Sequence, residues 1–280
     1  MSGRPVIAVG LGGTNGWFAL AWASDQAMAT GGGLVLCHAA PPGSPLLDAD
    51  VTSVASLETA DPALARALAA TRRRLGPSRV GLRVAGVPPV ELLLSTAAEL
   101  VVVGPPGHHF PPRAGSTAHA VAGRSPVPVV VARRGTGRGH GTFAGHVVVG
   151  FGDARSRGAL EFGFEQASLM GRPLAAVHVT DLGHDDYWFD DTMLSTHFAV
   201  QPAALERLAA EVEPWTHKYP EVPVKRAVFG GGPADGLVRA SLGAALLVVG
   251  HPHRPAAARA LLGSVPDRAV SAADAPVAVV

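Results

Sequence analysis

The chain has 280 residues, of which 48% are hydrophobic and 16% charged, and its formal net charge is +1. This length allows two domains of about 150 residues, and the composition excludes an intrinsically disordered chain. A net charge so close to zero argues against nucleic acid or an anionic membrane surface as a partner.

Short apolar segments alternate with longer, alanine-rich segments along the first half. The predicted strands are 5–10, 34–39, 79–85, 99–104 and 127–132, and the predicted helices are 14–30, 54–75, 89–97 and 115–123. The run at 101–103 has no polar alternation, which is typical of strands buried on both faces of a parallel sheet. Regular strand–helix alternation therefore predicts a doubly wound α/β domain.

A glycine-rich segment at 135–143 is predicted to be a flexible linker between a first domain, 1–134, and a second, 144–280. A glycine–arginine segment can also bind RNA, but this one is short and weakly charged. The second-half strands are predicted at 145–150, 174–179, 222–229, 245–250 and 276–280, and the helices at 155–171, 201–218, 233–242 and 260–272.

Residues 181–201 carry several aspartates around Tyr187, Trp188 and Phe189 and are predicted to be a loop. The loop could fold over a ligand at the strand ends. A surface excursion with a few packed aromatic side chains is the favoured interpretation.

The two halves repeat each other in order. The offset between matching positions is 140 at His38/His178, 146 at Gly104/Gly250, 148 at Gly115/Gly263 and 150 at Pro126/Pro276. An offset that drifts slowly over successive landmarks indicates an internal duplication. We therefore expect two tandem doubly wound parallel five-stranded sheets.

The single cysteine, Cys37, lies within an apolar strand pattern, so we expect a buried and unreactive thiol. A lone cysteine fits a reducing compartment. No apolar run approaches the roughly 20 residues of a membrane helix, and no signal-peptide layout is present at the amino terminus. These features predict a cytoplasmic protein.

Ligands of open α/β sheets bind at the carboxyl ends of strands where the winding direction reverses. If the first and fourth strands are neighbours, that point lies between Gly10 and Gly104 in one half and between Gly150 and Gly250 in the other. The segments 115–117 and 263–265 each place Gly-Ser at a helix start, where backbone amides can hold a phosphate. The alternative is that each serine merely caps its helix.

Other chemistry is poorly represented. The sequence contains no P-loop motif and no Gly-x-Ser-x-Gly nucleophile elbow. The histidines of the two loops after the fourth strands, and His184, do not form a set of converging metal ligands. We expect neither catalytic residues nor a metal site.

Over nearly its whole length the chain resembles a tandem universal stress protein, with two such domains in one polypeptide. The resemblance rests on the spacing from Gly250 to 263–265 and on the Ala-Pro-Val ending at 275–277. The opening strands that end in Val-Gly, the second strands with their histidine and the glycine-rich segment 230–235 add to it. It implies a Rossmann-like fold of the adenine nucleotide alpha hydrolase type and ATP, with or without Mg, as the ligand. The resemblance also implies a role in the stress response, with at most slow, incidental ATP hydrolysis.

The resemblance carries ligand contacts over to matching positions in both halves. They are Gly10, Gly12, Ala39, Val103, Gly104, Gly107, Gly115, Ser116 and Thr117 in the first half, and Gly150, Gly152, Val179, Val249, Gly250, His253, Gly263, Ser264 and Val265 in the second. The sequence departs from the family pattern in each half. Gly12 and Gly152 stand where nucleotide-binding members have an aspartate, the first half shortens the glycine spacing, and His253 replaces a glycine in the second.

The leading prediction is nucleotide-linked conformation or partner choice, with the second half as the better binding candidate. The alternative is a structural or interaction protein of the same fold whose sites have lost nucleotide binding. The resemblance also implies pairing of the last strands of the two domains, 127–132 with 277–280, and a homodimer is a further expectation.

Overall fold

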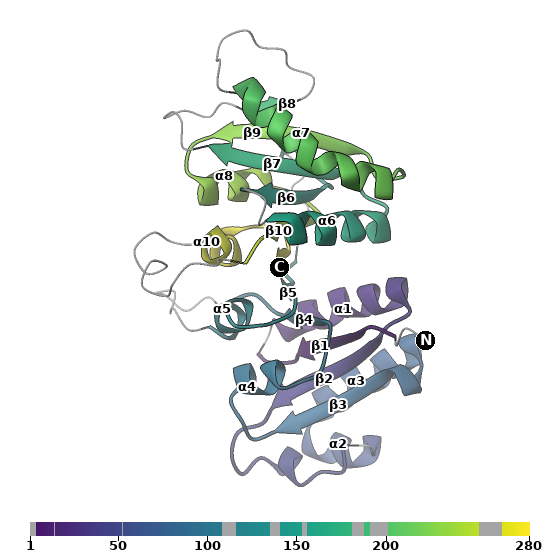
Figure 1. The fold of residues 1–280 in the computed structure, drawn as a ribbon. Coiled ribbons are helices and arrows are strands. Elements are labelled where there is room, and N and C mark those ends of the chain that lie inside the picture. Colours follow the sequence, from purple (N-terminus) through teal and green to yellow (C-terminus); the bar gives the residue numbers. More distant parts are fainter. Residues whose placement is uncertain are drawn as a thin grey trace. The chain divides into compact units, whose positions relative to one another are not determined.

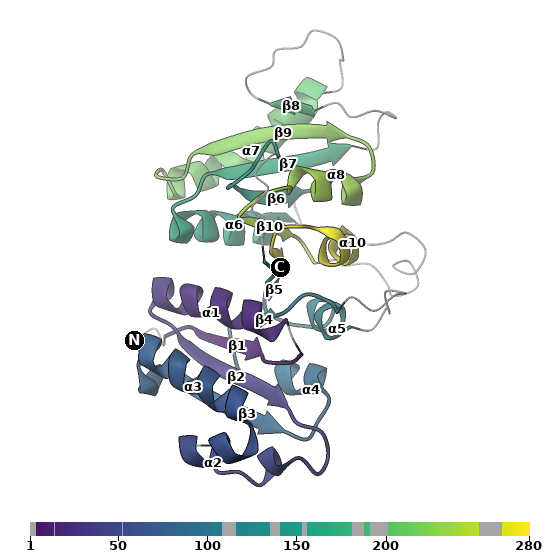
Figure 2. The ribbon, with the colours of Figure 1, turned by 180° about the vertical axis from the view of Figure 1, so that it is seen from behind.

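The computed structural model describes residues 4–13, 15–51, 53–107, 116–134, 141–152, 156–180, 188–190, 201–251 and 265–280. The chain divides into two compact units, Met1–Arg133 and Arg134–Val280. Each unit contains one sheet with helices on both faces (Figures 1 and 2).

The sheet of the first unit has five parallel strands in the order β3–β2–β1–β4–β5. The strands are β1 (Val6–Gly10), β2 (Gly33–Ala39), β3 (Val80–Ala85), β4 (Leu100–Val103) and β5 (Val129–Val131). Helices α1 (Gly16–Thr30) and α3 (Pro62–Leu75) cover one face, and α4 (Pro89–Leu94) and α5 (Thr117–Ala122) cover the other. Ile7 of β1 is paired with Leu34 and with Leu100, so β1 and β4 are the central neighbours that the sequence predicts.

The second unit repeats this order as β11–β10–β6–β7–β9 and adds one strand at the β9 edge. Its parallel strands are β6 (Val147–Phe151), β7 (Leu174–Thr180), β9 (Val224–Gly230), β10 (Leu246–Val249) and β11 (Val277–Val279). Helices α6 (Arg157–Met170) and α7 (Gln201–Lys218) lie on one face, and α8 (Pro233–Ala240) and α10 (Val265–Ala272) lie on the other. The predicted doubly wound α/β class is confirmed.

The additional strand corrects the prediction of a loop at 181–201. Strand β8 (Trp188–Asp190) pairs antiparallel with β9, with Phe189 opposite Val228. Without β8, the outer edge of β9 would expose unpaired backbone groups, and aromatic residues favour strand conformation. The remainder of the predicted loop, 181–187 and 191–200, lies outside the described residues.

The helix predicted at 54–75 is two helices, α2 (Val54–Ala60) and α3. Asp61 between them is extended, with φ −152° and ψ 93°, because the ring of Pro62 disfavours helical backbone in the residue before it. The Asp61 carboxylate accepts hydrogen bonds from the backbone amides of Ala63 and Leu64, each at 3.0 Å. Asp61 therefore starts α3 as its N-cap.

Phe143 belongs to the core of the second unit, although the sequence analysis placed it at the end of the linker. Its side chain is fully buried and makes edge-to-face contacts with His146 and Phe229, at ring-centroid distances of 5.8 and 6.2 Å. Residues 135–140 of the predicted linker lie outside the described residues.

None of the helices in the described ranges is long and apolar enough to cross a membrane.

We expect Phe143→Ala to destabilise the second unit by about 3–5 kcal/mol, because truncation of a fully buried aromatic side chain leaves a cavity. Urea unfolding followed by circular dichroism would measure the loss. Leu169→Ala, at a side chain that is 40% exposed, is the control and should cost much less. Equal losses in the two variants would contradict the assignment of Phe143 to the core.

Candidate functional site

A cavity of about 200 Å³ lies at the carboxyl ends of β1 and β4 in the first unit, on the sheet face covered by α4 and α5. Because β1 and β4 are neighbours whose connections leave toward opposite faces, the loops that follow them separate here. The predicted residues that line the cavity are Gly10, Gly12, Ala39, Val103, Gly104, Gly107, Ser116 and Thr117. Gly115 lies outside the described residues.

The sequence analysis missed the wall that α4 supplies. Pro89, Leu92 and Leu93 line the cavity, and they recur at the i, i+3, i+4 spacing of one helix face. That spacing is visible in the sequence and could have identified this helix face as a wall of the cavity. The other lining residues that were not predicted as contacts are Leu11, Asn15, Cys37, Pro105, Pro106 and Ala118.

The loops after β1 and β4 meet at Asn15. Its side-chain amide donates a hydrogen bond to the carbonyl of Pro105 at 3.4 Å. A Cβ atom on Gly104 would lie 2.6 Å from the carbonyl oxygen of Asn15. Gly104 is therefore required by the close approach of the chain's own backbone.

Ser116 is the N-cap of α5, the role that the alternative prediction assigned to it. Its hydroxyl oxygen accepts a hydrogen bond from the His119 backbone amide at 3.3 Å and lies 2.7 Å from His119 Nδ1. A hydroxyl can accept two hydrogen bonds and donate one. If His119 Nδ1 carries the hydrogen, the Ser116 proton is available to a ligand in the cavity.

Cys37 of β2 lies in the cavity wall and is 2% exposed. Burial raises the pKa of its thiol above the ordinary value of 9.0, and the hydrogen bond to Thr96 and the positive charge of Arg83 oppose this rise by less. The Thr96 hydroxyl oxygen lies 3.5 Å from the Cys37 sulfur and accepts a hydrogen bond from Arg83 Nη1 at 2.8 Å. Cys37 is therefore a neutral thiol at physiological pH.

The equivalent point of the second unit is packed more tightly. A Cβ on Gly10 would lie 3.4 Å from Leu93, but a Cβ on Gly150 would lie 2.6 Å from Leu237, the residue that corresponds to Leu93. Val179 stands where the first unit has Ala39 and lies against Gly236 of α8, whose added Cβ would be 2.8 Å away.

Of the other second-half predictions, Val249 is the last residue of β10, Gly250 follows it, and Val265 begins α10. Gly250 has no atom within 4 Å of an added Cβ. The Gly152 amide donates to the Ser156 hydroxyl at 3.0 Å. His253, Gly263 and Ser264 lie outside the described residues.

A search for groups of three or more His, Cys, Asp or Glu side chains able to hold a metal ion found none in the described ranges.

The sequence profile of the universal stress protein family matches residues 4–133 and again residues 144–280. The chain belongs to this family, with two copies of its domain in tandem. A universal stress protein of Mycobacterium tuberculosis, Rv2005c, is 33% identical over 198 residues, which cover 68% of this chain and 64% of that protein. The match thus spans less than two thirds of that relative's length.

Two solved structures of universal stress proteins are also similar. One from Archaeoglobus fulgidus is 16% identical, covers 98% of this chain and 95% of its own, and has a TM-score of 0.66, which shows the shared fold. Another, solved in complex with cAMP, is 20% identical and covers 49% of this chain and 98% of its own, with a TM-score of 0.37.

We expect Gly104→Ala to destabilise the first unit of this universal stress protein by about 1–3 kcal/mol, since its Cβ would overlap the Asn15 backbone. Gly12→Ala is the matched control, because a Cβ there meets nothing within 4 Å. Chemical unfolding of both variants measures the difference. Similar stabilities would show that the two loops do not pack as described.

For Cys37, we expect alkylation by iodoacetamide at pH 8 to be at least about tenfold slower in the native protein than in urea, because the thiol is buried and its pKa is raised. The raised pKa also stabilises the folded state below the ordinary thiol pKa. That contribution is lost as the pH rises, since the unfolded thiol ionises first. A native rate that levels off below pH 9 would contradict the raised pKa.

Proposed function

We propose that this universal stress protein binds an adenine nucleotide, with ATP as the predicted ligand, in the cavity between β1 and β4 of the first unit. Binding would act in the stress response by changing loop conformation or partner choice. The observation that carries the proposal is the convergence of the predicted first-half contacts on one cavity at the point where the sheet's winding reverses.

The cavity walls suit a flat base. Ala39, Leu92, Leu93 and Val103 supply apolar surface on three sides, and an aromatic ring gains most from contact with such surface. A volume of about 200 Å³ is below the 300–1,000 Å³ typical of sites that enclose a whole ligand. The cavity would therefore hold the base and part of the ribose, while the phosphates extend past its rim.

The rim offers neutral phosphate contacts. Gly107, Ser116 and Thr117 supply backbone amides and hydroxyls, which are the groups that bind phosphate at loop–helix junctions. The described lining residues include no charged side chain. Mg²⁺, if it accompanies ATP, would be held by the phosphates and by water, as is usual for this ion.

A ligand changes a conformational equilibrium only as far as its affinity differs between the two states. The Asn15–Pro105 hydrogen bond joins the loops after β1 and β4, and both loops line the cavity. A nucleotide that contacts both would favour their joined arrangement. This mechanism uses binding alone and needs no catalytic residue.

The second unit is a second candidate site on sequence grounds, through His253, Gly263 and Ser264. Its closer packing at Gly150 and Val179 makes it the less open of the two at the position of the base. A cytoplasmic location, a homodimer and pairing of the two last strands stay predictions from the sequence.

The proposal predicts that an adenine nucleotide leaves the purified protein on denaturation and is identified by mass spectrometry. ATP at 100 times its Kd should stabilise the binding unit by about 2.7 kcal/mol, seen as a rise in Tm. The Gly12→Leu variant should abolish this rise because its side chain would fill the open space beside Gly12.

Gly152→Leu, at the equivalent position of the second unit, is the matched control and should leave the ATP-dependent rise intact. If only Gly152→Leu abolishes the rise, the second unit holds the nucleotide. Absence of any bound nucleotide together with no ATP-dependent rise would leave the non-binding interaction protein as the function.

A further inference from the structure

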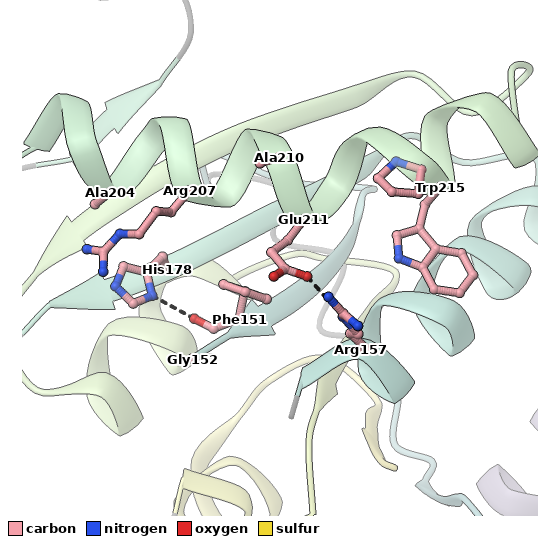
Figure 3. A pocket seen from close by; sticks show the side chains of 10 residues that line it. Phe151, Gly152, Arg157, His178, Ala204, Arg207, Ala210, Glu211 and Trp215 are labelled. Atoms are coloured by element: carbon pink, nitrogen blue, oxygen red, sulfur yellow. Dashed lines mark hydrogen bonds and ion pairs between the residues drawn. The ribbon is translucent and has the colours of Figure 1, made fainter. Parts of the chain in front are cut away.

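A second cavity, of about 660 Å³, lies in the second unit on the opposite face of the sheet from α8 and α10. It runs beside α7 from the carboxyl ends of β6 and β7 toward the end of the helix that carries Trp215 (Figure 3). The nucleotide cavity of the first unit lies on the α4 and α5 face. The two cavities thus occupy non-equivalent places in the duplicated fold.

The duplication provides an internal comparison for this cavity. In both units a histidine of the second strand bonds through Nδ1 to a carbonyl at the end of the first strand, His38 to Leu11 at 2.9 Å and His178 to Phe151 at 2.8 Å. A carbonyl oxygen only accepts, so Nδ1 carries the hydrogen. The ring is thereby oriented, and its Nε2 is left for another partner.

Around this shared histidine, the linings have diverged. The first-unit cavity beside His38 is distinct from the candidate nucleotide cavity. It measures about 170 Å³ and is lined by Trp17 and the N-cap carboxylate of Asp61. Arg157 of the second unit corresponds to Trp17 of the first, because the repeat has an offset of 140 residues at this point. Helix α7 adds Arg207 to the lining. Helix α7 has 18 residues against 14 in α3. The second cavity is therefore larger and has exchanged an acidic lining for a basic one.

The positive charge is not distributed evenly along the cavity. Arg157 Nε lies 3.1 Å from Glu211 Oε2, so this pair is neutral overall. Arg207 has no carboxylate partner among the described residues, and its Nε donates a hydrogen bond to the Ala203 carbonyl at 3.3 Å. Figure 3 shows Arg207 at the His178 end of the cavity. This end therefore presents a guanidinium beside an oriented imidazole.

The other end of the cavity is aromatic. Pro214 and Trp215 line it, and the Trp215 ring stacks on Phe164 with a centroid distance of 6.3 Å and an interplanar angle of 24°. Lys218 Nζ lies over the outer part of this cluster, 5.2 Å from the Trp215 centroid. From Arg207 to Trp215 the helix rises about 12 Å, which matches the length of a small organic molecule.

We propose that this cavity binds a small amphiphilic organic anion. Its oxyanion, a carboxylate or a phosphate, would be held by Arg207 and by the protonated form of His178, whose Nε2 then carries a hydrogen to donate. Its apolar body would lie along Phe151 and Ala210 toward Trp215. Guanidinium groups bind such oxyanions through paired, charge-assisted hydrogen bonds. A largely apolar cavity with a few convergent polar groups is the usual form of a small-molecule site.

The test uses the intact chain and two fluorescent probes that share an aromatic body. Anilinonaphthalene sulfonate carries an oxyanion, and N-phenylnaphthylamine is its neutral counterpart. We expect one sulfonate probe per chain, bound at least about tenfold more tightly than the neutral probe. Phenyl phosphate and phenylbutyrate, as competitors, distinguish a phosphate ligand from a carboxylate ligand. The proposal would be overturned if neither competitor displaced the sulfonate probe.

Two variants locate the bound probe. Arg207→Gln should weaken the sulfonate probe about tenfold, because a lost charge-assisted hydrogen bond corresponds to at least that factor, and should leave the neutral probe unchanged. Arg66→Gln, at an exposed arginine of α3, is its control. Ala210→Phe should exclude both probes by filling the cavity, while Ala203→Phe, at an exposed α7 position outside the lining, should not.

Equal binding to wild type and Arg207→Gln would overturn the proposal, and so would displacement of the sulfonate probe by ATP. The result of the probe-binding test does not depend on the result of the ATP-binding test. Gly12→Leu should abolish the ATP effect without changing probe binding, and a protein that binds no nucleotide would still be expected to bind the sulfonate probe.

Discussion

The pairing of β1 with β4 is the constraint on which the first unit depends, and β6 with β10 repeats it in the second. These strands are apolar throughout and buried on both faces, so helices must cover each side of the sheet. Because the chain leaves β1 and β4 toward opposite faces, their following loops diverge at the strand ends, although the Asn15–Pro105 hydrogen bond joins them farther on. The candidate nucleotide cavity is the space that results.

Both units preserve this arrangement of strands, but the larger side chain lies on the helix in one unit and on the strand in the other. Ala39 and Leu92 of the first unit correspond to Val179 and Gly236 of the second. The first unit therefore has the smaller residue on the strand and the larger one on the helix, and the second unit has the larger residue on the strand. Val and Gly together are smaller than Ala and Leu, so the exchange also changes the volume that the two side chains fill. The exchange leaves the fold unchanged but moves the space available to a ligand, which is how one architecture can hold different cavities in its two copies.

The glycines near the strand ends of the two units are present for different physical reasons. Gly104 is confined by the Asn15 backbone and Gly150 by the Leu237 side chain, whereas Gly12 and Gly250 face open space. A glycine pattern read from sequence combines these cases, since each shows only that a side chain is absent. Contact with the rest of the fold separates a glycine needed for packing from one that leaves room for a ligand.

The order of elements and the doubly wound class followed from apolar periodicity and the repeat. The family resemblance supplied the part of the first-half cavity lining at the strand ends, but not the wall that α4 provides. What depended on tertiary contact was not accessible in this way. Strand β8 forms only because the edge of β9 is available, and Phe143 is core because Phe229 lies beside it. The basic cavity beside α7 likewise brings together Arg157, His178 and Arg207 from three elements. Their proximity is a property of the folded chain, because no spacing in the sequence records it.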